Sequence, residues 1–463
     1  MRFPWLLAAC VALLVGAPLQ ARDQPAQAIP AHGVIGIQEQ HLTPEFWVSR
    51  LATPDAVVLD KAAIAAQNAT LLRTDPTMHD LRALPATLAR AQVAGWIEAL
   101  SQRPEAAIYD VDGEQVRDAT LDALVAELAI AAIPESQPTR HGLVVHRADL
   151  RTFPTALRIF SRSGETDIDR FQESALFPGT PVVIAHESRD GNWWFVVSPR
   201  YAAWVEKQHV AEGSAAEVFA YVDKTPYRVV TGATERTVFT REQPAVSELQ
   251  LDMGVRVALA DWPADKAVNG QHPYTTHVIE LPTRGADGKL QRVPALLPKR
   301  ADSAADYLPL TQANLIRQAF KFLGERYGWG HAYNGRDCSG FASEIYRSMG
   351  VQIPRNTRDQ ARSPALDHTL FGDGDGKQRM AAVDALQVGD LVYIPGHVMM
   401  MIGRVDGAPY VIHDTNGGAY LGTDGKLRRM ALNGVSVTPL LPMMFNEGER
   451  YVDRITSIVR IRP

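Results

Sequence analysis

The chain contains very little cysteine, with 2 residues among 463, Cys10 and Cys338. Cys10 falls inside an apolar N-terminal segment that is typical of an export signal. We therefore expect the exported protein to keep one thiol, Cys338, and to form no internal disulfide. A lone thiol in an oxidising compartment is a liability unless it is buried or takes part in chemistry. Cys338 is thus the first candidate functional residue.

The chain also lacks a dominant charge. Lys and Arg number 47 against 52 Asp and Glu, which gives a net charge of −5. No general basic field is available to gather nucleic acid or anionic lipid. Apolar residues make up 46% and charged residues 21%, which excludes a fibrous or a disordered chain. The length allows about three domains, each with a core of its own.

No apolar run is long enough to span a membrane. The longest, Phe3–Val15, falls short of the roughly 20 residues that a span requires. It follows a basic start and precedes small Ala21, a cleavage point, so residues 1–21 have the pattern of a secretory signal peptide. We expect an exported protein of the periplasm or cell envelope. An alternative is a lipid anchor on Cys10, although cleavage there leaves an unusually short signal.

The hydrophobic period changes twice along the rest of the chain. Residues 22–137 have helical spacing, which predicts a helical N-terminal stabilising segment. Short strands separated by turns follow and predict two small all-β barrels, at 138–220 and 221–302. The pattern of residues 303–463 is helix, helix, then strands, which predicts an α+β domain.

Cys338 is predicted to begin the second helix of this last domain. A helix N-terminus favours the thiolate and so lowers a cysteine pKa. A cysteine nucleophile also needs a base and a group that orients the base. His397 and His413, on adjacent predicted strands, can supply both. A zinc site is the competing interpretation, but structural zinc normally has a fourth protein ligand and closely spaced ligand pairs.

The C-terminal domain contains five short motifs in a fixed order. They are Tyr327–Gly330, Arg336–Phe341, Ile353–Arg355 with Gln360, Gly389–Val392, and Gly396–Val398 with Ile402–Gly403. Together they resemble the NlpC-type bacterial cell-wall cysteine peptidases. The preceding segments resemble, more loosely, the branch of this family that carries bacterial SH3-like domains. The resemblance implies a multi-domain protein: an α+β papain-like C-terminal catalytic domain, preceded by a helical segment and two small all-β SH3-like barrels.

The resemblance also implies an activity. Members of this branch hydrolyse the bond between γ-D-glutamate and a diamino acid in peptidoglycan stem peptides, and no metal or organic cofactor is implied. The matching positions make Cys338 the nucleophile, His397 the general base and His413 the orienting residue. Tyr327 would help to hold the oxyanion together with the backbone N–H of Cys338, and Trp329 falls in the same substrate-binding motif.

Asp337 precedes the nucleophile directly. Its carboxylate would raise the thiol pKa if it faced the sulfur, so we expect it to face a cation. In barrel-bearing members of the family the matching aspartate binds the free amine of an N-terminal L-alanine, and Ser339 matches a second contact. The resemblance therefore implies a preference for stem peptides with a free N-terminal L-Ala. The simpler alternative is that Asp337 only caps the helix, and both roles can coexist.

Two departures from the family pattern concern the shape of the pocket. His331 stands where a second glycine is commoner, and Met399–Met401 replaces a run that usually contains glycine. Two other functions also fit the sequence. One is a catalytically inert cell-wall-binding protein, against which the presence of all three candidate catalytic residues argues. The other is a papain-like amidase or acyltransferase on another amide, since a fold alone does not fix the substrate.

Overall fold

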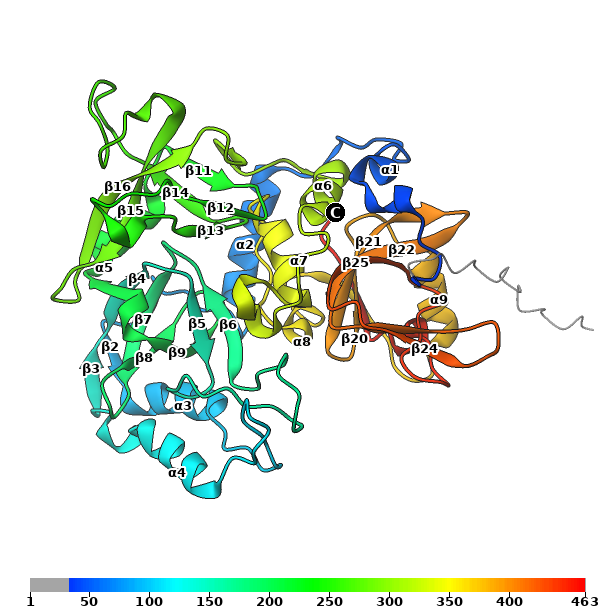
Figure 1. Ribbon diagram of the computed structural model, residues 1–463, viewed down its shortest axis with the longest axis horizontal. Helices are drawn as coiled ribbons and strands as arrows, with labels where there is room; N and C mark the ends of the chain where they lie inside the picture. Colours follow the sequence, from blue (N-terminus) through cyan, green and yellow to red (C-terminus); the bar gives the residue numbers. More distant parts are fainter. Residues whose placement is uncertain (1–32, 463) are drawn as a thin grey trace, which may run out of the picture.

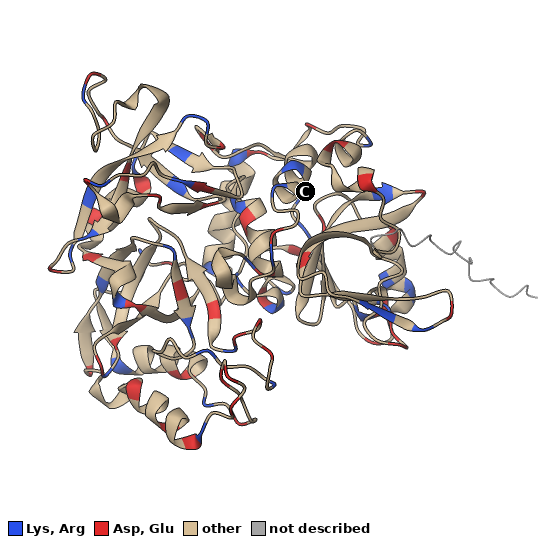
Figure 2. Ribbon diagram, in the orientation of Figure 1, with Lys and Arg blue, Asp and Glu red and all other residues tan. Residues whose placement is uncertain are grey.

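Figure 1 shows the part of the chain that the computed structural model describes, residues 33–462. Two β units lie on one side of the molecule, and an α+β domain lies on the other. The signal peptide predicted at residues 1–21, with Cys10, lies outside the described residues. Figure 2 shows Lys and Arg residues interspersed with Asp and Glu residues along every part of the ribbon, in keeping with the small net charge. Among the described helices, none has the length and apolar character needed to cross a membrane.

The N-terminal residues contain short helices and short strands. Their elements are η1 Glu39–Leu42, α1 Pro44–Val48, β1 Val57–Leu59, α2 Lys61–Thr74, β2 Thr87–Ala89, α3 Arg90–Leu100, α4 Asp118–Glu127, η2 Ile130–Ala132 and β3 Ser136–Pro138. Trp47 of α1 is buried against Tyr410 of the C-terminal domain, with ring centroids 5.4 Å apart. Val93 of α3 and Leu121 of α4 pack instead with Trp204 of the first β unit. The segment is therefore divided between two neighbours and has no core of its own.

The first β unit is a seven-stranded antiparallel sheet in the order β10-β4-β7-β8-β9-β5-β6. Its strands are β4 Arg140–Val144, β5 Ala148–Arg151, β6 Gln172–Leu176, β7 Pro181–Glu187, β8 Trp193–Val197, β9 Ala202–Glu206 and β10 Val210–Gly213. All of β8 is buried, because α3 and α4 cover one face and the sheet closes on the other. This explains why β8 is a continuous apolar run without alternation.

The second β unit follows helix α5, Ala215–Asp223, whose first turn is closed by a capping box between Ser214 and Glu217. It has a five-stranded sheet, β16-β15-β14-β11-β17, and the pair β12-β13. Its elements are β11 Tyr227–Val230, β12 Thr234–Arg236, η4 Pro244–Val246, β13 Gln250–Asp252, β14 Arg256–Leu259, η5 Pro273–Thr275, β15 Thr276–Arg284, β16 Leu290–Pro298 and β17 Ser303–Ala304.

The C-terminal domain packs helices on a six-stranded antiparallel sheet, β19-β26-β20-β21-β22-β25. Its helices are α6 Gln312–Phe320, η6 Trp329–Asn334, α7 Cys338–Arg347, α8 Thr357–Gln360, α9 Gly376–Asp384 and η7 Tyr451–Arg454. Its strands are β18 Leu310–Thr311, β19 Asp367–Leu370, β20 Leu391–Ile394, β21 His397–Val405, β22 Ala408–Thr415, β23 Gly418–Leu421, β24 Leu427–Met430, β25 Gly434–Pro439 and β26 Ser457–Arg460. Strand β18 pairs with β1 and so ties the N-terminal segment to this domain.

Helix α7 is the element that positions the candidate site. Its apolar face, with Phe341 and Ile345, packs on Met400 and Ile412 of strands β21 and β22. Met399 and Met401 of β21 pack into the core on the opposite face of the sheet. The methionines that replace the glycine-containing run are thus fully buried sheet core. This packing brings the first residue of α7 to the strands that carry the two histidines.

Candidate active site

Cys338 is the first residue of α7 and is 5% exposed. The helix starts here because Asp337, in extended backbone, caps it: the Gly340 N–H donates to Asp337 Oδ1 at 2.8 Å. Cys338 Sγ lies 4.0 Å from the carbonyl oxygen of Gly396, the residue before His397. The helix thus directs the thiol to the start of β21.

The two histidines form the start of a hydrogen-bonded chain across three neighbouring strands. His397 Nε2 lies 2.7 Å from His413 Nδ1, and His413 Nε2 lies 3.0 Å from Thr438 Oγ1 on β25. Nδ1 is therefore the ring nitrogen of His397 left to face a reacting group. Within residues 33–462 the hydrogen-bond partner of Cys338 Sγ is the Gly396 carbonyl and not the His397 ring.

The protonation states differ from the sequence-based expectation. Burial, and then the charge of Asp337, raise the pKa of Cys338 to about 12. The prediction that the helix N-terminus lowers this pKa is wrong in direction for the substrate-free chain, because these two effects outweigh the helix. Burial also lowers the pKa of His397 to about 4. Thiol and imidazole are thus both neutral at pH 7, and the imidazole is free to accept a proton.

Asp337 faces a cation, as its position predicted. Arg355 Nη2 donates to Asp337 Oδ2 at 2.8 Å, and both side chains are buried. Burial alone would raise the pKa of Asp337, but Arg355, His331 and the Gly340 N–H together outweigh it and hold the pKa at about 2. Oδ1 also accepts from Ser339 Oγ at 3.0 Å and Oδ2 from the Gly330 N–H at 3.1 Å. With five donors, including Gly340 N–H and both Arg355 nitrogens, the carboxylate has no acceptor site left.

A cleft of about 500 Å³ opens beside the histidines. Tyr327, His397, Thr415 and residues of η7 and the β23-β24 pair line it. Burial and the nearby Cys338 raise the pKa of Tyr327, so its hydroxyl stays protonated and can donate a hydrogen bond. Trp329 lies outside the described lining, and its buried Nε1 has no hydrogen-bond partner among the described residues.

His331, which stands where glycine is commoner, is a buried connector. Its Nδ1 accepts from Arg355 Nη2 at 2.9 Å, and its Nε2 donates to Glu344 at 3.0 Å. The ring fits only because Gly340 has no side chain: a Cβ there would lie 2.5 Å from the ring carbon Cε1 of His331. The departure therefore braces the loop before the nucleophile and does not enter the described lining of the cleft.

Both β units hold this loop. Gln172 Nε2 of β6 donates to the Gly330 carbonyl at 2.9 Å. Arg147 of the first β unit donates to the His331 carbonyl at 2.9 Å and to Asp252 Oδ1 of the second β unit at 2.7 Å. Arg336, two residues before Cys338, reaches the same Asp252 oxygen at 3.2 Å. One buried ion cluster therefore joins all three parts next to the nucleophile.

The structure identifies residues that the sequence did not. Thr438 carries no motif, and only the register of β25 on β22 places it beside His413. Glu173 of β6 accepts hydrogen bonds from the hydroxyls of Thr152 and Tyr201, and its backbone carbonyl accepts from Arg355. Across residues 33–462 its carboxylate forms no ion pair. In the same range, no group of three or more His, Cys, Asp or Glu side chains is arranged to hold a metal ion.

Comparisons with known proteins match two parts of the chain to known families. Residues 324–427 match the NlpC/P60 family, and residues 158–206 match the SH3 domain of the SH3b1 type. Dipeptidyl-peptidase 6 of Lysinibacillus sphaericus is 25% identical over 242 residues, which cover 52% of this chain and 80% of that protein. The gamma-D-glutamyl-L-lysine dipeptidyl-peptidase of Bacillus subtilis (strain 168) is 31% identical over 102 residues, 20% of this chain and 34% of that relative.

The fold is shared with a solved structure. An NlpC/P60 endopeptidase from Photobacterium damselae subsp. piscicida matches with a TM-score of 0.69 at 16% identity, over 86% of this chain and 90% of that one. This likeness, together with the two domain matches, confirms the predicted fold class of SH3-like and papain-like parts. The chain thus combines an SH3-like domain, matched at residues 158–206, with a following papain-like domain whose residues 324–427 are similar to the NlpC/P60 family.

Proposed function

We propose that the protein is an exported cysteine endopeptidase that hydrolyses the γ-D-glutamyl–diamino acid bond of peptidoglycan stem peptides. One observation carries this proposal: the thiol of Cys338 points to the start of β21, where His397 is hydrogen-bonded to His413. A neutral thiol directed toward the strand end that carries a neutral, oriented imidazole is compatible with general-base-assisted attack. The names of the Bacillus relatives support the choice of bond.

The proposed reaction begins with proton transfer from Cys338 Sγ to His397 Nδ1 as the sulfur attacks the γ-glutamyl carbonyl carbon. The oxyanion accepts hydrogen bonds from the Cys338 N–H, which lies at a helix start, and from the Tyr327 hydroxyl. Collapse releases the diamino acid, whose amine takes the proton from His397. A water molecule then gives its proton to His397, attacks the thioester and frees the thiol. His413 and Thr438 hold the ring throughout.

The first β unit supports a preference for free stem peptides. Strand β6 packs on η6, and Arg355 Nε donates to Ser174 Oγ at 2.6 Å, which closes this side of the loop before the nucleophile. Because Asp337 already accepts five donors, we assign the substrate ammonium group to Glu173 instead, whose carboxylate forms no ion pair in the described chain. Asp337 and Ser339 act at this end of the site indirectly, because both accept hydrogen bonds from Arg355 and so fix its position.

Location and partners follow from the same proposal. A hydrolase of the cell wall works outside the cytoplasm, which fits the signal peptide predicted at residues 1–21 and the SH3-like domain. Peptidoglycan stem peptides are the proposed partners, and the predicted domain limits at residues 138, 221 and 303 remain part of the proposal.

Mass spectrometry of products from defined muropeptides tests the reaction. With the tripeptide L-Ala-γ-D-Glu-diamino acid we expect the dipeptide L-Ala-D-Glu and the free diamino acid. An inert wall-binding protein would give no product, and an amidase would cut a different amide. An acyltransferase would give an adduct when a second amine is added. Any of these three results would contradict the proposal.

The pH profile tests the protonation states. Because burial lowers the pKa of His397 to about 4, its ring stays neutral and able to accept a proton down to mildly acidic pH. We expect kcat/KM to hold near its maximum down to about pH 5 and to fall as the pH approaches that pKa. Initial rates measured at constant ionic strength, with circular dichroism to exclude acid unfolding, check this. A midpoint near the ordinary histidine value of 6.5 would contradict it.

A further inference from the structure

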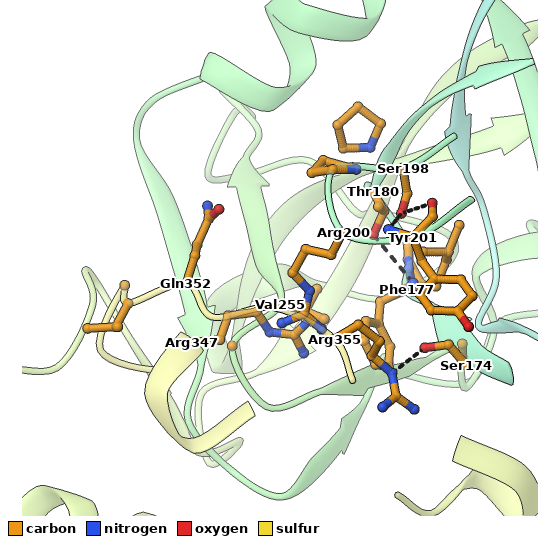
Figure 3. Close-up of a pocket in the computed structure, with 18 of the residues that line it drawn as sticks. Ser174, Phe177, Thr180, Ser198, Arg200, Tyr201, Val255, Arg347, Gln352 and Arg355 are labelled. Carbon is orange, nitrogen blue, oxygen red and sulfur yellow. Dashed lines mark hydrogen bonds between the residues drawn. The ribbon is translucent and has the colours of Figure 1, made fainter. Parts of the chain in front are cut away.

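A second cavity lies where the two β units meet the C-terminal domain. Its volume is about 230 Å³, far above the roughly 10–15 Å³ that one water molecule occupies on this measure. Its walls come from all three parts of the chain. They include Ser174 and the loop after β6, residues 199–201, Gly254 and Val255, and residues 350–352. Figure 3 shows the side chains that line it.

This cavity is separate from the cleft that His397 lines, although it adjoins the proposed amine end of the site, since Ser174, Tyr201 and Arg355 line the cavity. Arg347, at the last position of α7, lines the cavity, whereas Cys338 is the first residue of the same helix. A helix of 10 residues is about 15 Å long. No residue that lines the histidine cleft also lines the cavity.

The lining of the cavity carries positive charge, which Glu344 behind it offsets only in part. Arg200 and Arg347 both line it, and no Asp or Glu does among the described lining residues. Neither arginine forms an ion pair within residues 33–462. Arg200 Nη1 makes a long hydrogen bond of 3.4 Å to the Ile353 carbonyl, and Arg347 Nε donates to the Met253 carbonyl at 3.2 Å. Figure 3 shows the two guanidinium groups turned toward each other inside the pocket.

Two neighbouring guanidinium groups in a half-buried place repel each other. Burial, and then the charges of Arg347 and Arg355, lower the pKa of Arg200 to about 9. Arg355 is paired with Asp337, so the excess positive charge in the lining comes from Arg200 and Arg347. An oxyanion between them would relieve it, because a guanidinium matches a carboxylate with two parallel hydrogen bonds.

Part of the remaining wall is apolar. Leu176, Phe177, Val255 and Val351 line it, and Arg347 lies over the Phe177 ring at 4.5 Å. Such a wall favours a ligand with a hydrocarbon part beside its charged group. We propose that this cavity binds a small organic carboxylate, with the carboxylate between Arg200 and Arg347 and a short apolar chain against Phe177 and Val351. This site does not depend on the proposed reaction.

Isothermal titration calorimetry with hexanoate as the probe tests the proposal, with hexylammonium and inorganic phosphate as comparison probes. We expect the full-length protein to bind hexanoate saturably at one site per chain and hexylammonium not at all. Phosphate should bind more weakly than hexanoate, because it leaves the apolar wall uncovered. Cys338→Ala, which changes the nucleophile at the other end of α7, should leave hexanoate binding unchanged.

Two variants locate the site. Arg200→Gln is expected to weaken hexanoate binding by about tenfold or more, since one guanidinium partner is removed. Gln352→Glu adds a carboxylate at the exposed rim of the cavity and should also weaken binding without disturbing the core. Gln115→Glu makes the same charge change on an exposed residue far along the chain and should have no effect.

Five results would overturn the proposal. Four are no hexanoate binding, equal binding by wild type and both cavity variants, equal affinity for hexylammonium, and phosphate binding as tight as that of hexanoate. The fifth is loss of hexanoate binding in Cys338→Ala, which would place the ligand in the cleft that His397 lines.

Discussion

Cys338→Ala is expected to abolish hydrolysis of the stem peptide while the protein stays folded. The sulfur makes the bond to the substrate carbonyl in the proposed reaction, and alanine offers no nucleophile. We expect kcat to fall by about 10⁴-fold or more, as when a member of a catalytic triad is removed. Product formation measured by mass spectrometry, and the thermal unfolding midpoint measured by circular dichroism, check the two halves of this prediction.

The matched variants separate chemistry from folding. Cys338→Ser keeps the size of the side chain at the start of α7 and should be nearly as inactive, because the serine hydroxyl is much harder to deprotonate than the thiol. His397→Ala should lower kcat by several orders of magnitude, and His413→Ala should lower it less, since His413 acts by holding the His397 ring. Substantial activity in Cys338→Ala would refute the proposed nucleophile.

The sequence could predict the parts of the site that short-range patterns encode. The apolar stripe of α7 and the alternating strands that follow it fix which faces are buried. Once α7 packs on β21 and β22, Cys338, His397 and His413 must meet at one edge. For the same reason Asp337, as the residue before the helix, was predictable as its cap.

Contacts between distant segments could not be predicted in this way. Thr438 meets His413 only through strand pairing, and Glu173 meets Arg355 only because β6 packs on the C-terminal domain. The predicted direction of the thiol pKa was wrong for a related reason. A helix start can be recognised in the sequence, but the burial that raises the pKa is a property of the assembled domain. The short strands β1 and β2 were also not predicted, since three residues are too few to define a hydrophobic period.

Acetylation of the substrate's N-terminal L-alanine is expected to lower kcat/KM of the wild type by tenfold or more. The proposed amine site offers the Glu173 carboxylate, with the Tyr201 hydroxyl on one of its oxygens. Acetylation removes the charge of the ammonium group and leaves that carboxylate without a cation. Loss of one member of such a charge pair costs roughly 2–5 kcal/mol, and about 1.4 kcal/mol is a factor of ten.

Variants at the carboxylates show which one meets the amine. Glu173→Gln should lower kcat/KM for the free peptide by tenfold or more and should change little for the acetylated peptide. Glu114→Gln, a matched change on an exposed residue, should leave both values unaltered. Asp337→Asn should also lower kcat/KM by at least tenfold, but it leaves buried Arg355 without its partner, so its unfolding midpoint must fall too. Only Glu173→Gln is therefore expected to separate recognition from stability.

Intact murein gives the decisive comparison, because its stem peptides are joined to glycan at the same alanine nitrogen. A closed site that binds an ammonium group should bind glycan-linked peptides poorly for two reasons. Their alanine nitrogen carries no charge, and the sugar chain does not fit. We expect cleavage of glycan-linked murein to be at least as slow as that of the acetylated peptide, with mass spectrometry of released fragments as the measurement. Efficient cleavage of intact murein would refute the closed end formed by β6, Arg355 and Ser174. It would leave the roles proposed for Cys338, His397 and His413 untouched, because the thiol and the histidine chain reach the scissile bond whatever lies beyond the alanine.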